Sequence, residues 1–169
     1  MDRAGVRDLV FVHGDLAGAG RFGGWGFAFS PRYAAILNAL FTWDRDGRLA
    51  EAKALWVADP LFAHSATIPG VSERLQQMVD QYGKWRLLND DPHRPLDPPT
   101  KDQLGSIAAP TLVMVREHDI PDFHEIASML TTGIPGACQL ALPNAGHMAN
   151  LDAPEAFNHA LLEFLLAAK

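Results

Sequence analysis

The chain has 169 residues, with 14 basic and 20 acidic side chains and a formal net charge of −6. This length predicts a single globular domain, and a hydrophobic content of 48% is enough to form a buried core. The acidic balance, without a cluster of Lys and Arg, argues against a nucleic-acid partner. The sequence has no stretch of about 18 apolar residues, so we expect no membrane-spanning helix, and we find no leader-like segment. A single cysteine, Cys138, excludes an internal disulfide, so we expect a cytoplasmic protein.

The first half of the chain begins with a short apolar run at residues 9–12, which predicts a buried strand. The strand leads into a loop with six glycines between residues 14 and 26. From Pro31 to about Leu88 the apolar residues recur at helical spacing, which predicts three or four short helices. Four prolines within residues 89–99 then prevent a continuous helix and mark the clearest internal boundary of the chain.

The second half alternates strand and helix patterns. Residues 111–115 and 139–142 predict strands, and a helix carrying Ile126 and Leu130 lies between them. Asp152 with Glu155 three residues later resembles the start of a further helix. We expect Cys138, at the edge of the second strand pattern, to be a buried and inert thiol. The order strand–helix–strand–helix predicts an α/β fold whose parallel strands are covered by helices.

Two side chains follow these strands at the positions where an α/β sheet collects its reactive groups. Asp119 comes after the first strand and His147 after the second. Because the carboxyl ends of parallel strands lie at one edge of the sheet, we expect the two side chains to meet. A carboxylate that accepts from one imidazole nitrogen leaves the other nitrogen available as a base. The alternative is that Asp119 caps a turn and His147 is an ordinary loop histidine.

Residues 107–166 resemble the C-terminal end of the α/β-hydrolase fold superfamily. The matching segments are Ile107–Val115, Glu117–Pro121, Ile134–Ala137, Pro143–Met148, Pro154–Phe157 and Phe164–Leu165. The resemblance implies a partial α/β-hydrolase fold, with Asp119 as the acid and His147 as the base of a catalytic triad. It divides the chain into an N-terminal strand and loop of the core (1–30), a helical cap (31–106) and a C-terminal core (107–169). The pocket walls or cap core that it implies are Trp25, Trp43, Trp56 and Trp85.

The nucleophile of that family sits in a Gly-x-Ser-x-Gly turn, and this sequence lacks such a turn. Of the five serines, only Ser65 has small neighbours at both flanking positions. It lies in the helical region with no strand before it. We therefore interpret Ser65 as a serine of a cap loop.

Residues 9–12 match the family in three ways. As the strand before the cap, which we favour, they imply that the nucleophile turn and the oxyanion loop are absent from this chain, and they make Asp15 an alternative acid. As the oxyanion strand, they place His13 and Gly14 where backbone amides stabilise an oxyanion. As the nucleophile strand, they offer Asp15 as a carboxylate nucleophile, as in dehalogenases and epoxide hydrolases.

Three functions follow from these alternatives. The first is a hydrolase of esters or similar small apolar substrates that uses the His147–Asp119 pair. The second is a truncated, inactive relative that binds a small ligand or a partner chain, and the third is an enzyme with Asp15 as its nucleophile. A half-sheet leaves a strand edge unpaired, so we also expect self-association or a partner strand. We expect no cofactor and no metal, because Pro121 interrupts the spacing of His118 and His124 and the glycine loop lacks a phosphate-binding frame.

Overall fold

The computed structural model describes residue 31, residues 47–82 and residues 98–167. The described residues fall into two compact units, one holding residues 31, 47–82 and 98–100 and the other holding residues 101–167. The predicted strand at residues 9–12, the glycine-rich loop and most of the proline-rich connection lie outside the described residues. No helix in the described segments is long and apolar enough to cross a membrane.

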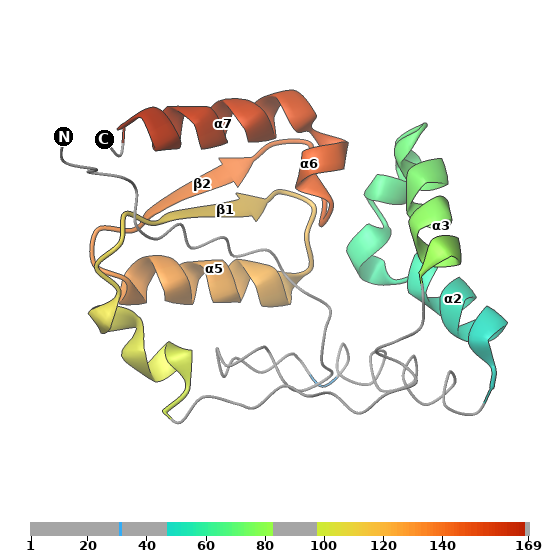
Figure 1. The fold of residues 1–169 in the computed structure, drawn as a ribbon, viewed down its shortest axis with the longest axis horizontal. Helices are drawn as coiled ribbons and strands as arrows, with labels where there is room; N and C mark the ends of the chain where they lie inside the picture. Colours follow the sequence, from blue (N-terminus) through green and yellow to red (C-terminus); the bar gives the residue numbers. More distant parts are fainter. Residues whose placement is uncertain (1–30, 32–46, 83–97, 168–169) are drawn as a thin grey trace, which may run out of the picture. The chain divides into compact units, whose positions relative to one another are not determined.

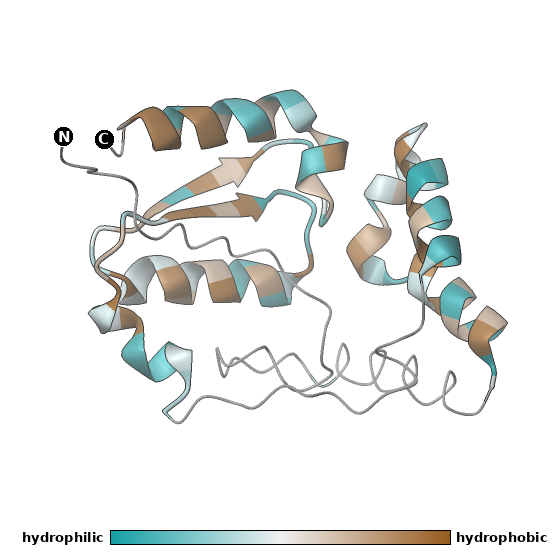
Figure 2. Cartoon of the chain, in the orientation of Figure 1, coloured by the Kyte–Doolittle hydropathy of each residue, from teal (hydrophilic) through white to brown (hydrophobic). Residues whose placement is uncertain are grey.

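The unit of residues 47–82 is helical. Its elements are α2 (Leu49–Val57), η1 (Pro60–Phe62), η2 (Ser65–Thr67) and α3 (Val71–Gln81). The short helix η1 begins where the sequence requires, because Pro60 fixes its first turn and Asp59 Oδ1 accepts the N–H of Leu61 at 2.9 Å. Only two residues of α3, Leu75 and Val79, are buried, and hydrophilic and hydrophobic residues alternate along this helix in Figure 2. The helical pattern predicted for this part of the sequence is thus confirmed.

The unit of residues 101–167 has an α/β arrangement. It begins within the 3-10 segment η3 (Thr100–Ser106). The elements that follow are β1 (Leu112–Arg116), α5 (Pro121–Gly133), β2 (Cys138–Leu142), α6 (Ala149–Asp152) and α7 (Pro154–Ala167). The two strands are parallel, in a register that runs from Leu112 opposite Cys138 to Arg116 opposite Leu142. A parallel pair needs a crossover, and α5 supplies it. The predicted α/β class is confirmed at this level.

Helices α5 and α7 lie on opposite faces of the two-stranded sheet (Figure 1). Met114 of β1 packs with Leu142, Ala145 and Ala160 in the cluster that α7 covers. Successive residues of a strand point to opposite faces, so Val113 and Val115, both buried, face α5. Hydrophobic packing against α5 and α7 therefore holds β1 on both of its faces.

Two details differ from the sequence-based expectations. Cys138 is exposed, because in the described part of the chain β2 pairs with β1 along one edge only and four of its five residues are exposed. Helix α7 begins at Pro154, close to the predicted start, but Asp152 does not precede it as a capping residue. Asp152 is the last residue of α6, and its carboxylate instead binds the backbone N–H of Gly146.

Candidate acid–histidine site

The ends of the two parallel strands bring Asp119 and His147 together. Asp119 lies three residues beyond β1, and His147 lies five residues beyond β2. Two backbone hydrogen bonds continue the strand pairing into these loops: Glu117 donates to Leu142 O at 3.1 Å, and His118 donates to Ala145 O at 2.9 Å. The loops are therefore held side by side at the carboxyl edge of the sheet, as the sequence predicted.

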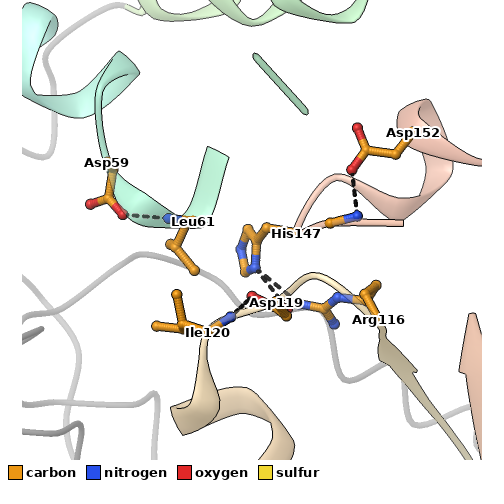
Figure 3. A network of polar contacts seen from close by, with 8 residues as sticks. Asp59, Leu61, Arg116, Asp119, Ile120, His147 and Asp152 are labelled. Atoms are coloured by element: carbon orange, nitrogen blue, oxygen red, sulfur yellow. Dashed lines mark hydrogen bonds and ion pairs between the residues drawn. The ribbon is translucent and has the colours of Figure 1, made fainter. Parts of the chain in front are cut away.

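The acid and the imidazole are in polar contact and almost completely buried. His147 Nδ1 lies 3.4 Å from Asp119 Oδ2, and the two side chains are 4% and 0% exposed. The other carboxylate oxygen, Asp119 Oδ1, accepts the backbone N–H of Ile120 at 2.9 Å. In Figure 3 the ring of His147 points toward Asp119. The structure thus brings together the two residues to which the resemblance assigns catalytic roles.

A third charged side chain, which the sequence analysis did not identify, completes this cluster. Arg116 Nη2 forms an ion pair with Asp119 Oδ2 and lies 2.9 Å from His147 Nδ1. The guanidinium carbon lies 5.4 Å from the centre of the Phe123 ring, and that ring lies 4.9 Å from the ring of His147. Arg116 Nε is buried and has no hydrogen-bond partner among the described residues, whereas Nη2 contacts both Asp119 and His147. The feature of the sequence that could have identified Arg116 is a charged residue at the end of an apolar strand, three positions before Asp119.

The loop that carries His147 is fixed by two further side chains. Gly146 donates its N–H to Asp152 Oδ2 at 2.8 Å, and Asn144 donates its N–H to Glu117 Oε2 at 2.9 Å. Asn144 has a φ of 52°, in the left-handed region that asparagine tolerates better than most residues. These contacts tie the loop after β2 to the loop after β1 and to α6.

The electrostatic surroundings keep Asp119 ionised. Burial raises the pKa of its carboxyl, but the polar contact with His147 and the charges of His147 and Arg116 lower it. The Ile120 N–H adds to them, and the net result is a pKa below the usual 3.8. At neutral pH the site therefore contains a buried carboxylate beside a guanidinium and an imidazole.

The other candidate residues lie either in the helical unit or outside the described residues. Asp15, His13, Gly14, Trp25, Trp43 and Trp85 lie outside the described residues. Trp56 lies in α2, is half-buried and packs edge-to-face on Tyr82 at 5.1 Å between ring centres. Ser65 lies in η2 with a completely buried side chain. Among the described residues, no group of three or more His, Cys, Asp and Glu side chains is placed to hold a metal ion.

Comparison with known proteins finds no family model that matches the chain and no solved structure that matches it. Its function is therefore argued from the sequence and from the geometry of the cluster formed by Arg116, Asp119 and His147.

Proposed function

We propose that the chain is a hydrolase of the α/β-hydrolase type that acts on esters or similar small apolar substrates. His147 transfers the proton in this reaction and Asp119 orients His147. The observation that supports the proposal most strongly is the 3.4 Å contact between His147 Nδ1 and Asp119 Oδ2, at the ends of two parallel strands. The sequence resemblance over residues 107–166 supports it independently.

The proposed chemistry is acyl transfer. An oxygen nucleophile adds to the ester carbonyl carbon, and its proton moves to Nε2 of His147. The imidazolium then gives this proton to the alkoxide that leaves when the ester C–O bond breaks. For Nε2 to accept the proton, Nδ1 must carry the other one and donate it to Asp119. The buried carboxylate would stabilise the imidazolium that forms between the two proton transfers.

The family resemblance also includes a helical cap at residues 31–106 and a pocket that uses tryptophans such as Trp56. The helical character of residues 47–82 supports this part of the proposal. We further propose that β2 joins a second chain along its outer edge, because the described residues pair it only with β1. An unpaired strand edge presents a row of backbone donors and acceptors to another chain.

The proposal is tested by the hydrolysis of p-nitrophenyl acetate and butyrate by the wild-type protein and by Asp119→Asn. An amide cannot hold the imidazole in the required state, so we expect Asp119→Asn to lower kcat by about 10²–10⁴-fold. Asp122→Asn, which changes a nearby carboxylate of α5, is the matched control. Equal rates for wild type and Asp119→Asn would contradict the proposed role of the acid.

The identity of the nucleophile separates this function from the carboxylate-nucleophile alternative. If Asp15 forms an ester intermediate, mass spectrometry of the quenched protein would detect the added acyl or alkyl group on the peptide that contains Asp15. In that case Asp15→Asn would abolish the adduct and the turnover. If activity survives Asp15→Asn, the alternative is excluded.

A second candidate function, ligand or partner binding without turnover, is favoured by one observation. Arg116 Nη2 lies 2.9 Å from His147 Nδ1, and a donor at that atom opposes the proton position that a base requires. A folded wild-type protein that hydrolyses neither ester faster than buffer would favour this second function over the first.

A further inference from the structure

The contact between Arg116 and His147 places a permanent donor against one imidazole nitrogen. A guanidinium has N–H donors and no acceptor, so Nη2 donates in this contact. It lies 2.9 Å from His147 Nδ1, within the normal hydrogen-bond range. The competing contact, from His147 Nδ1 to Asp119 Oδ2, measures 3.4 Å and exceeds the usual range. The geometry at Nδ1 therefore favours accepting from Arg116 over donating to Asp119.

A neutral imidazole has one N–H and one lone pair, and its partners decide which nitrogen has which. When Nδ1 accepts from Arg116, the proton must be on Nε2. Asp119 does not need the proton of His147 in this arrangement, because its two oxygens already bind the Arg116 guanidinium and the Ile120 N–H. Both charged groups are thus satisfied while the imidazole holds its proton at Nε2.

We propose that Arg116 is a positioning residue that holds His147 in the Nε2–H tautomer. In this state Nε2 is a hydrogen-bond donor, and it cannot act as a base. The basic tautomer forms when the Arg116 guanidinium leaves Nδ1, Nε2 gives its proton to solvent and Nδ1 takes one from solvent, so that the new Nδ1–H donates to Asp119 Oδ2. Arg116 therefore restrains the proton transfer at this site.

The aromatic ring of Phe123 gives this restraint a structural basis. It lies against the guanidinium of Arg116 and against the ring of His147, and all three side chains are buried. Movement of the guanidinium away from Nδ1 must therefore disturb close packing, which is costly in a protein interior. Figure 3 shows the guanidinium and the imidazole meeting beside the same carboxylate.

The direct test is the tautomer of His147 in the full chain, measured by long-range ¹H–¹⁵N NMR at a pH where the imidazole is neutral. The His147 signals are assigned by their loss in His147→Gln. We expect protonated Nε2 and unprotonated Nδ1 in the wild-type protein. Protonated Nδ1 in the wild type would overturn the proposal, and this measurement requires no variant of Arg116.

Variants of Arg116 test the cause. We expect Arg116→Met to move the proton to Nδ1, Arg116→Lys to retain protonated Nε2, and Arg74→Met, an exposed arginine of α3, to change nothing. An unchanged tautomer in a folded Arg116→Met would also overturn the proposal. Since a residue with a merely structural role does not set a tautomer, this result separates positioning from folding.

The consequence for catalysis rests on the proposed function and is measured separately. Without the Arg116 donor, a larger fraction of His147 has the tautomer that can act as a base. We therefore expect Arg116→Met to raise kcat/KM for p-nitrophenyl acetate about tenfold. This is the effect of losing one hydrogen bond of ordinary strength. A wild-type protein with the expected tautomer but without turnover would refute the hydrolase function and retain the role of Arg116. Turnover by a wild-type protein with protonated Nδ1 would retain the hydrolase function and refute the role of Arg116.

Discussion

The backbone N–H of Gly146 donates to Oδ2 of Asp152 at 2.8 Å, which closes the loop carrying His147 onto α6. The sequence pattern predicts Asp152 at the start of the last helix. Its actual role is to hold the residue next to His147, so it acts on the site through the backbone.

The first prediction concerns this bond. Asp152→Ala leaves the Gly146 N–H without its acceptor, so we expect the free energy of unfolding to fall by about 1–3 kcal/mol in urea titrations. Asp152→Asn keeps an oxygen in place and should lose less. Equal losses for the two variants would show that the hydrogen bond to Gly146 does not contribute to stability.

The second prediction concerns the end of α5, where Gly133 packs on Leu104 of η3. A Cβ added at Gly133 would lie 2.7 Å from Leu104 Cδ1 and 3.0 Å from Leu104 Cβ. Leu104 is buried, so relief requires a shift of packed atoms, and we expect Gly133→Ala to destabilise the protein by about 1–3 kcal/mol. Gly105→Ala is the control, because no atom lies within 4 Å of its added Cβ. A neutral or stabilising Gly133→Ala would contradict this packing.

The third prediction concerns pH. Because the pKa of Asp119 is lower in the folded protein than its usual 3.8, the folded state holds this proton less tightly than the unfolded state does. The resulting stabilisation is fully present above about pH 4 to 5 and is lost as the pH falls through the folded pKa. Urea titrations between pH 7 and pH 2.5 should therefore show the difference between wild type and Asp119→Asn shrinking below pH 4. A difference that stays constant over this range would contradict the lowered pKa.

The fourth prediction concerns association through β2. The described residues pair this strand on one edge only, and Leu140 within it is 39% exposed. We expect a dimer or larger species by light scattering at micromolar concentration. Leu140→Lys should reduce it, because charge on an edge strand opposes pairing, whereas Gln76→Lys, an exposed position of α3, should not. A monomeric wild-type protein would rule out self-association.

Much of the α/β unit could be predicted from the sequence because its signals are local. The apolar run at residues 111–115 predicts β1 within one residue, and Gly133 ends α5 where the sequence predicts the end of that helix, whereas α5 begins at Pro121, which the sequence places in the preceding loop. The meeting of Asp119 with His147 follows from the parallel order of the strands. Local pattern and topology were sufficient for these features.

The remaining features depend on contacts between distant residues, which periodicity does not encode. The exposure of Cys138 depends on which strand edges are covered, and the contact of Arg116 with His147 joins residues 31 positions apart. An arginine at the end of a strand ordinarily points to solvent. Here the carboxylate of Asp119 and the ring of Phe123 give it a buried position that only the three-dimensional arrangement shows.

The most direct measurement of the central proposal is the rate of p-nitrophenyl acetate hydrolysis by wild type, His147→Gln and His159→Gln. His159 is an exposed histidine of α7, with a side chain 75% accessible to solvent, and serves as the matched control. We predict turnover above buffer in the wild type and in His159→Gln, and a kcat/KM about 10²–10⁴-fold lower in His147→Gln. Equal rates for a folded His147→Gln and the wild type would contradict a hydrolase that uses the His147–Asp119 pair.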